Sequence, residues 1–100
     1  MTAFLLSERA LERLESIGEY TEKQWGIAQR DKYLEALDKR FHDLARLPLL
    51  GRHRNDLKMG LHSFQEGKHV IFYVIEDEGI SIIDILHERE DVAARREGWN

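Results

Sequence analysis

The sequence contains no cysteine and only one proline in 100 residues. Without cysteine the chain can form neither a disulfide nor a thiolate zinc site, and it has no cysteine nucleophile, which fits a reducing cytoplasm. The N-terminus MTAFLLSERA lacks the basic region and the long apolar stretch of a signal peptide. No segment reaches the ~20 consecutive apolar residues of a membrane span. We therefore expect a soluble cytoplasmic protein that does not contact a membrane.

Positive charge is also scarce. Lysine and arginine together number 15 against 19 aspartate and glutamate residues, so the formal net charge is −4. Proteins that bind phosphate backbones usually carry a basic face, because their affinity comes from the release of counterions by lysine and arginine. The charge balance therefore favours a protein partner over direct contact with nucleic acid. The hydrophobic fraction of 42% and the length predict one globular domain over residues 1–100.

The first half of the chain has helical periodicity. Residues 2–6 predict a short strand, and Ser7 is a good N-cap for the helix that follows. Apolar residues then recur at spacings of three and four as far as Trp25, and Gly26 ends this helix. A second amphipathic helix begins at residue 27 and ends before Pro48. Because a single glycine joins the two helices, we expect an antiparallel hairpin.

The second half changes to the two-residue period of strands. Residues 48–60 predict a basic loop, and residues 61–65, 68–75 and 80–87 predict three strands joined by tight turns. The segment HVIFYVI is apolar on both faces, as a central strand is. Residues 91–96 predict a helical turn capped by Asp91. The predicted fold class is α+β in the order β-α-α-β-β-β, with the helical hairpin on one face of a mostly antiparallel sheet.

Two histidines are predicted to lie close together. In either of two registers of the last hairpin, with Lys68 or Val70 opposite His87, the His87 side chain lies beside His69 at the same end of the sheet. A closed metal site would need a third and a fourth ligand. We therefore interpret the pair as half-exposed residues at strand ends and expect no metal and no cofactor.

Asp84 interrupts the last apolar strand. It could accept a hydrogen bond from the hydroxyl of Tyr73, or it could face solvent on an edge strand, where a charge discourages pairing with another chain. We favour the solvent-facing position. Trp25 and Trp99 are expected to pack in the core and the tail rather than to stack on bases.

The basic loop offers a candidate for catalysis. An RNA-cleaving patch, in which arginine stabilises developing charge and histidine transfers a proton, could form from Arg52, His53, Arg54 and Lys58 of the loop with His62 and Arg89. Acidic residues lie in the same segments, so a solvated surface is the favoured interpretation. The sequence has no phosphate-binding glycine loop and no nucleophile elbow.

An ordered set of short motifs resembles the ParE toxins of bacterial toxin–antitoxin modules and spans nearly the whole chain. These motifs are LESIGEYT at 14–21, QWG at 24–26, LP at 47–48, LGR at 50–52, GLHSF at 60–64, GKHVIFY at 67–73 and ILHERED at 85–91. The resemblance implies the RelE/ParE fold and a toxin neutralised by a ParD-type antitoxin whose C-terminal segment wraps around it. It also implies that the toxin binds DNA gyrase and traps the cleaved-DNA state without chemistry of its own.

Two other functions stay open at this point. One is a ribosome-dependent mRNA endoribonuclease, as in the RelE branch of the superfamily, and the other is a non-toxic module that only binds its antitoxin. Three departures count against the ribonuclease: the C-terminal segment EREDVAARREGWN has no tyrosine, and His62 and Asp84 stand where the family often has arginine.

We therefore interpret the C-terminal end of the last strand as part of a recognition surface and not as a catalytic centre. The residues expected on the surface for the target or the antitoxin are His69, Tyr73, His87, Arg89, Arg52, Arg54 and His62. Apolar residues of the hairpin, namely Leu11, Ile17 and Phe41, are candidates for the antitoxin contact, although each also fits the core.

Overall fold

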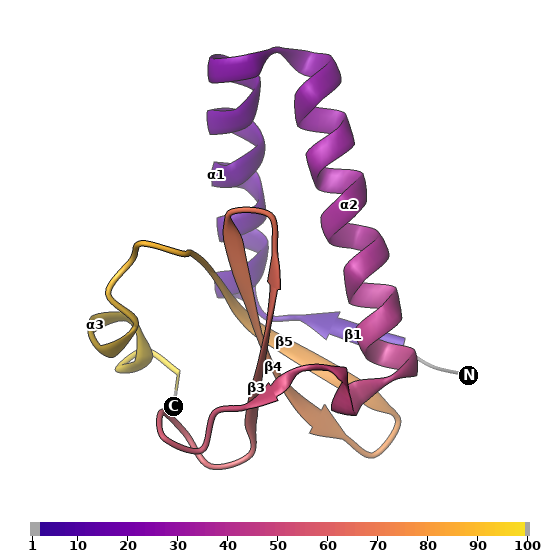
Figure 1. Cartoon of the computed structure of the whole chain (residues 1–100), viewed down its shortest axis with the longest axis vertical. Helices are drawn as coiled ribbons and strands as arrows, with labels where there is room; N and C mark the ends of the chain where they lie inside the picture. The colour runs from indigo at the N-terminus through magenta and orange to yellow at the C-terminus, as the bar shows by residue number, and fades with distance from the viewer. Residues whose placement is uncertain (1–2, 100) are drawn as a thin grey trace.

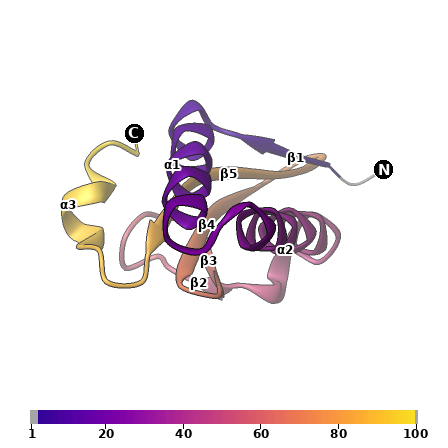
Figure 2. The same cartoon turned by 90° about the horizontal axis from the view of Figure 1, so that it is seen from above.

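The computed structural model describes residues 3–99. A five-stranded sheet carries a helical hairpin on one face and the C-terminal segment on the other (Figures 1 and 2). The sheet order is β1-β5-β4-β3-β2, in which β1 runs parallel to β5 and the other neighbours are antiparallel. The elements are β1 (Ala3–Leu6), α1 (Glu8–Trp25), α2 (Ile27–Arg46), the 3-10 turn η1 (Pro48–Leu50), β2 (Arg52–His53), β3 (Leu61–Glu66), β4 (His69–Glu76), β5 (Gly79–His87) and α3 (Val92–Arg96). The predicted α+β fold with a helical hairpin on one face is confirmed.

The segment predicted as one loop, residues 48–60, contains two short elements. The turn η1 follows α2 directly, and β2 pairs with β3 through Arg52 opposite Ser63 and His53 opposite His62. A two-residue strand has no periodicity of its own, so the sequence pattern could not reveal it. Its pairing extends the sheet by one edge strand.

The helical hairpin begins and turns as its sequence predicts. The Ser7 hydroxyl accepts a hydrogen bond from the Ala10 amide at 3.0 Å and donates one to the carbonyl of Ile83 at 2.8 Å, which ties the start of α1 to β5. Gly26 has φ 93° and ψ 172°, a conformation open to glycine, and it links α1 directly to α2. The hairpin buries its apolar face on the sheet in a core that includes Leu37, Phe41, Leu44, Ile71, Ile82 and Ile85.

A β-bulge between β4 and β5 decides which face the end of β5 presents. Phe72 is opposite Asp84 whereas Tyr73 is opposite Ile82, so Ile83 is an extra residue on β5. Such an insertion shifts the alternation of all later side chains. Ile85 therefore continues the helix-facing core, and His87 lies on that same face opposite His69. Asp84 is turned to the outer face.

The outer face carries a second, smaller core that the C-terminal segment covers. Leu61, Phe72 and Leu86 pack there with Trp99, and Val92 of α3 lies against them. The predicted solvent-facing position of Asp84 is wrong: β5 pairs with strands on both sides, and the Asp84 carboxylate is fully buried. The single charge of Asp84 in an apolar strand suggested a solvent-facing position on an edge strand. The sequence pattern does not reveal which side chains contact the carboxylate in the folded chain.

The two tryptophans differ in their surroundings. Trp99 is buried in the outer core, as predicted, whereas Trp25 is 72% exposed at the tip of the hairpin, so the prediction of a packed Trp25 is wrong. Of the apolar residues considered for the antitoxin contact, Ile17 and Phe41 lie in the core, and Leu11 is 50% exposed. A helical period places a residue on a face, but it does not say how far the opposing sheet extends beneath that face.

Candidate functional site

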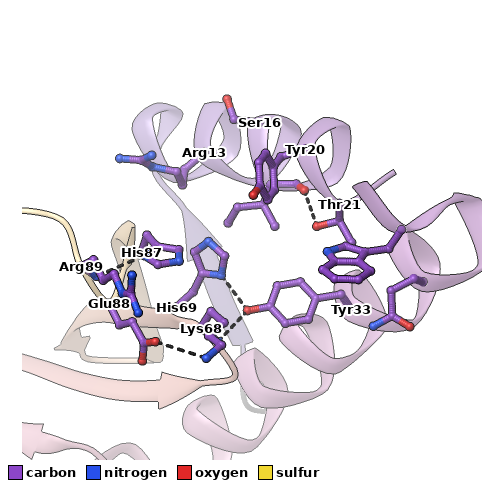
Figure 3. A pocket seen from close by; sticks show the side chains of 13 residues that line it. Arg13, Ser16, Tyr20, Thr21, Tyr33, Lys68, His69, His87, Glu88 and Arg89 are labelled. Atoms are coloured by element: carbon purple, nitrogen blue, oxygen red, sulfur yellow. Dashed lines mark hydrogen bonds and ion pairs between the residues drawn. The ribbon is translucent and has the colours of Figure 1, made fainter. Parts of the chain in front are cut away.

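A groove of about 620 Å³ runs between α1, the start of α2 and the end of the sheet where β4 begins and β5 ends (Figure 3). Aromatic and aliphatic side chains form its helical end, and histidines with charged side chains form its sheet end. The lining residues are Arg13, Ser16, Ile17, Tyr20, Thr21, Trp25, Gln29, Tyr33, Lys68, His69, His87, Glu88 and Arg89.

The two histidines that the sequence placed together do meet in the groove. His69 is directly opposite His87 in the β4–β5 ladder, a register between the two considered from sequence. Their ring centres are 5.4 Å apart and the rings are nearly perpendicular. The bulge upstream on β5 keeps His87 on the same face as His69.

Tyr33 of α2 holds His69 from the other side of the groove. The Tyr33 hydroxyl lies 2.6 Å from Nδ1 of His69 and accepts a hydrogen bond from the Lys68 amide at 3.1 Å. Burial raises the pKa of the Tyr33 phenol. Burial, with the neighbouring His87 and Arg13, lowers the pKa of His69 to about 4. His69 is therefore neutral at physiological pH.

Gly67 makes this approach of Tyr33 possible. It has φ 59° in the turn between β3 and β4, and a Cβ atom there would lie 2.8 Å from the nearest carbon of the Tyr33 ring. Glycine supplies both the positive φ and the space. The turn and the ring thus fix one wall of the groove.

The end of β5 is fixed by hydrogen bonds of His87. The His87 amide donates to Oε1 of Glu90 at 2.8 Å, and the Arg89 amide donates to Nδ1 of His87 at 3.1 Å. The other oxygen of Glu90 accepts from Arg13 of α1 at 2.7 Å. These contacts hold the His87–Glu90 turn against the first helix.

Glu88 has two partners at the sheet end of the groove. It accepts a hydrogen bond from Gln65 at 2.7 Å and lies 3.6 Å from the Lys68 amine. The Gln65 bond, followed by the nearby Lys68, lowers the pKa of the Glu88 carboxyl. Glu88 is therefore ionised and already supplied with donors.

The remaining sequence-predicted site residues lie apart from the groove. His62 is buried on β3 between the rings of His53 and Tyr73, with ring centres at 4.6 and 5.4 Å. Its Nδ1 donates to the Gly60 carbonyl at 3.2 Å, and its Nε2 is buried without a partner among the described residues. The residues of the predicted recognition surface therefore do not form one patch, because His62 lies apart from the His69–His87 pair.

Tyr73 and the two loop arginines have structural contacts. The Tyr73 hydroxyl donates to the Pro48 carbonyl at 2.7 Å and accepts from the Gly51 amide at 3.0 Å, and the residue is fully buried in the core. Arg54 is 3.2 Å from Asp56, whereas Arg52 is exposed on the edge strand β2. Tyr73 therefore supports η1 from inside and is not on the surface of the free chain.

Sequence reasoning missed most of the helical side of the groove. Ile17 was named as a candidate for the antitoxin contact, but Arg13, Tyr20 and Tyr33, which also line the groove, were not proposed as site residues. Arg13, Ile17 and Tyr20 follow a spacing of three to four, so one face of α1 carried a usable signal. The inclusion of Tyr33 depends on how α2 packs, which the sequence pattern does not specify.

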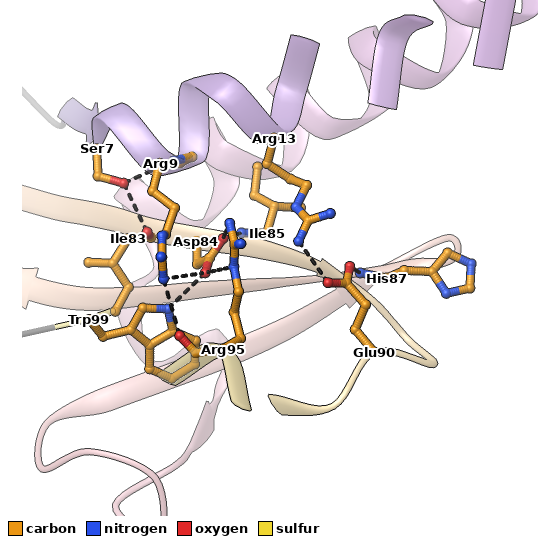
Figure 4. A network of polar contacts seen from close by, with 11 residues as sticks. Ser7, Arg9, Arg13, Ile83, Asp84, Ile85, His87, Glu90, Arg95 and Trp99 are labelled. Carbon is orange, nitrogen blue, oxygen red and sulfur yellow. Dashed lines mark hydrogen bonds and ion pairs between the residues drawn. The ribbon is translucent and has the colours of Figure 1, made fainter. Parts of the chain in front are cut away.

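A second polar cluster lies on the outer face, around the buried carboxylate of Asp84 (Figure 4). Nε of Arg95 donates to it at 2.8 Å, the Trp99 indole donates at 2.8 Å, and the Ile85 amide donates at 2.9 Å. Arg9 of α1 lies 3.9 Å from the carboxylate and donates to the Arg95 carbonyl at 3.1 Å. The hydrogen bond to Asp84 raises the pKa of Arg95.

This cluster fastens the C-terminal segment to the sheet and to the start of α1. Asp91 adds an N-cap to α3, accepting from the amides of Ala93 and Ala94, as the sequence predicted. Because the donors around Asp84 come from three separate segments, the cluster closes the outer layer.

Residues 3–99 contain no group of three or more histidine, cysteine, aspartate or glutamate side chains arranged to hold a metal ion. Within the same part of the chain, no helix is long and apolar enough to cross a membrane.

Comparison of the sequence with protein families gives one that covers most of the chain. Residues 4–92 match the model described as ParE toxin of type II toxin-antitoxin system, parDE. The chain belongs to the ParE toxin family. The resemblance inferred from the ordered motifs is confirmed, and with it the assignment to the toxins of type II toxin–antitoxin systems.

Named relatives of this ParE-family chain come from several organisms. It is 34% identical over 90 residues to Toxin ParE1 of Mycobacterium tuberculosis, covering 89% of this chain and 92% of the relative. It is 31% identical over 94 residues to Toxin ParE1 of Caulobacter vibrioides, covering 94% and 97%. It is 30% identical over 96 residues to Toxin ParE of Escherichia coli, covering 95% and 93%.

Solved structures share the fold of this ParE-family chain at lower identity. A chain of the chromosomal ParDE toxin–antitoxin system from P. aeruginosa superposes with a TM-score of 0.73 at 15% identity, covering 87% of this chain and 96% of the other. A chain of the RelBE2 toxin–antitoxin complex from Mycobacterium tuberculosis gives 0.63 at 24% identity, covering 86% and 96%. At these identities the likeness shows the fold alone.

Proposed function

We propose that this ParE-family toxin inhibits DNA gyrase by binding the enzyme and trapping its cleaved-DNA state, and that a ParD-type antitoxin neutralises it. A ligand that binds one state of gyrase more tightly than the others raises the population of that state, so the toxin needs no chemistry of its own. The family match over residues 4–92 supports the toxin assignment. The proposal places the toxin in the cytoplasm, without a cofactor and without direct contact with nucleic acid.

One observation carries the non-catalytic part of the proposal: an arginine at each of the two candidate sites is paired with a carboxylate. Arg54 pairs with Asp56, and Arg13 pairs with Glu90 at 2.7 Å. A ribonuclease needs cations directed at phosphate and a histidine that titrates near neutral pH. His69 has a pKa of about 4, far below that range. The arrangement supports binding rather than RNA cleavage.

The exposed aromatic residues support a protein partner. Tyr20 is 64% exposed and Trp25 is 72% exposed, and both line the groove beside the half-buried ring of Tyr33. Tyrosine and tryptophan are enriched among the residues that contribute most to protein–protein binding. We infer that a segment of the antitoxin covers these side chains, folding as it binds.

We assign the antitoxin and gyrase to two different regions of the toxin surface. In this proposal the antitoxin lies in the groove, whereas the surface for gyrase includes the edge at β2 with the exposed Arg52. The antitoxin then neutralises the toxin by holding it in a complex whose bulk keeps gyrase away from that edge.

The test is a gyrase supercoiling assay on relaxed plasmid DNA, with the purified toxin titrated alone and then with its cognate antitoxin. The expected result is loss of supercoiling with accumulation of linear DNA after protein digestion, reversed at an equimolar amount of antitoxin. A parallel reaction with topoisomerase I in place of gyrase is the control for general effects on DNA.

Other outcomes identify the competing functions. Cleavage of translated mRNA by the toxin, with gyrase unaffected, would establish the ribosome-dependent endoribonuclease. If neither assay responds and expression does not arrest growth while the antitoxin still binds, the chain is a binding module without toxicity.

A further inference from the structure

The sheet end of the groove combines positive charge with hydrogen-bond donors. Among the described residues that line the groove, Arg13, Lys68 and Arg89 are cationic and Glu88 is anionic. With Glu90, which pairs with Arg13 beside the groove, this end has three positive and two negative side chains, in a chain whose net charge is −4. Arg13 is paired with Glu90 and Lys68 lies 3.6 Å from Glu88, so Arg89 is the lining cation that has no carboxylate partner among the contacts between described residues.

The hydrogen bonds of His87 fix its tautomer. The Arg89 amide donates to Nδ1 of His87 at 3.1 Å, so Nδ1 carries no proton. A neutral imidazole with an unprotonated Nδ1 must carry its proton on Nε2. His87 therefore offers an Nε2–H donor to the groove that it lines.

The contacts of His69 are compatible with the same tautomer. The Tyr33 hydroxyl lies 2.6 Å from Nδ1 of His69 and 3.2 Å from the Glu66 carbonyl, so it can donate to either one. A carboxylate bound at Nε2 of His69 would select the tautomer in which Tyr33 donates to Nδ1 and Nε2 carries the proton. Both imidazoles would then be donors into the same groove.

We propose that the sheet end of the groove is a carboxylate-binding site, in which a glutamate or aspartate side chain of the antitoxin accepts hydrogen bonds from Nε2 of His69 and His87 and pairs with Arg89. The ring centres of the two histidines lie 5.4 Å apart, a spacing that allows the two oxygens of one carboxylate to be shared between them. The same peptide would place apolar side chains against Tyr20 and Trp25 at the helical end.

The shape of the site favours a peptide over a folded surface. A volume of about 620 Å³ lies in the range of pockets that accept a few side chains. Its extent, from Trp25 at the end of α1 to Arg89 after β5, suits an amphipathic segment with an acidic residue beside apolar ones. This inference rests on the proposed antitoxin partnership and specifies the chemistry of the contact.

The test measures binding of the cognate antitoxin by calorimetry. Each aspartate and glutamate in the C-terminal half of the antitoxin is replaced in turn by asparagine or glutamine. One replacement is expected to weaken binding by about tenfold to a hundredfold, the range of a charge-assisted hydrogen bond. These changes leave the toxin intact, so they do not depend on how a toxin variant folds.

The toxin side is tested with His87→Phe, which keeps a ring and removes the donor. This variant should weaken the binding of wild-type antitoxin by a similar factor. Its effect on the affinity for the antitoxin that lacks the critical carboxylate should be less than twofold. The matched control is His42→Phe on α2, an exposed histidine outside the groove, which should leave both affinities unchanged. In ¹⁵N spectra of the histidine side chains, Nε2 of His69 and His87 should shift when antitoxin is added.

The outcomes separate the two levels of the proposal. If no acidic residue of the antitoxin matters, or if His87→Phe weakens both forms of the antitoxin equally, the carboxylate site is wrong while the antitoxin partnership stands. If wild-type antitoxin does not bind the toxin at all, the partnership fails and the carboxylate assignment fails with it.

Discussion

The groove and the Asp84 cluster both contain charged and hydrogen-bonding side chains, but the two regions use them for opposite purposes. Around Asp84 every carboxylate oxygen has a donor, and the carboxylate is fully buried under Trp99 and Arg95. In the groove the imidazoles of His69 and His87 each use Nδ1 within the protein, and their Nε2 atoms make no hydrogen bond to another described residue. A closed set of polar groups stabilises a fold, whereas an open set is available to a partner.

The two regions are joined through α1. Arg9 reaches the Asp84 cluster, and Arg13, one turn later on the same helix, reaches Glu90 beside the groove. Both contacts tie the C-terminal segment to the first helix, as Figure 4 shows. The comparison predicts that substitutions at Asp84 change stability, that substitutions at His69 or Tyr33 change it less, and that substitutions at Arg89 leave it unchanged.

The largest effect is expected for Asp84→Ala. Removal of the carboxylate leaves the buried Trp99 indole and the partly exposed Arg95 without their acceptor. The expected loss is about 3 kcal/mol, the lower end of the range for a buried pair, because water can reach Arg95. Urea unfolding followed by circular dichroism measures the loss. In a Trp25→Phe background, the fluorescence of Trp99 should shift to longer wavelength as the segment is released.

Asp84→Asn serves as the matched variant, because it keeps the shape and one acceptor oxygen. It should lie between wild type and Asp84→Ala in unfolding free energy. A loss below 1 kcal/mol for Asp84→Ala would show that the C-terminal segment is held by its apolar contacts alone.

The second effect is a pH dependence from His69. Its pKa is about 4 in the folded protein against 6.5 in an unfolded chain, so the unfolded state binds more protons between these values. The unfolding free energy should therefore fall as pH decreases from 6.5 to 4, and the contribution of His69 is present above pH 6.5. A difference of about 2.5 between the two pKa values corresponds to an upper bound of about 3.4 kcal/mol. The expected value is smaller, because the ring is partly exposed to solvent.

Urea unfolding at a series of pH values measures this slope, with His69→Gln as the comparison. The charged groups around His69 are Arg13 and His87, which oppose its protonation, and Glu88 and Glu90, which favour it. Because those groups remain in the variant, the difference between the two curves isolates His69. Equal slopes for the two proteins would contradict a neutral, desolvated imidazole.

An intermediate effect is expected for Tyr33→Phe. The substitution removes the hydroxyl that contacts Nδ1 of His69 and accepts from the Lys68 amide, and loss of such half-buried hydrogen bonds costs about 1–2 kcal/mol. Thermal or urea unfolding gives the value. Tyr20→Phe is the control, since Tyr20 is 64% exposed, and it should change the free energy of unfolding by less than about 0.5 kcal/mol. Similar losses for both tyrosines would contradict the role of Tyr33.

The smallest effect on stability is expected for Arg89→Ala. Among the contacts between described residues, the Arg89 guanidinium makes no hydrogen bond or ion pair, although the side chain lines the groove. Its removal should change the free energy of unfolding, measured by urea unfolding, by less than about 0.5 kcal/mol. The same substitution should lower the affinity for the antitoxin. A stability loss of 2 kcal/mol would show that the groove is closed in the manner of the Asp84 cluster.

Periodicity, caps and turns predicted most of the fold. Ser7 and Asp91 cap their helices as expected, and the apolar run of β4 is the central strand. That His69 and His87 lie at the same end of the sheet also followed from the hairpin, because cross-strand pairing depends on local spacing. Their position on one face depends on the bulge. The site was half predicted, since its sheet side was identified and its helical side, with Arg13 and Tyr33, was not.

What the sequence determined by itself is what neighbouring residues decide: helices, strands, turns and the motifs that relate the chain to the ParE toxins. Tertiary structure alone decided the rest. The bulge at Ile83 chose the faces of Asp84 and His87, and partners far along the chain made a lone aspartate the buried anchor of the C-terminus. Such positions depend on the sum of distant contacts, and no local pattern encodes that sum.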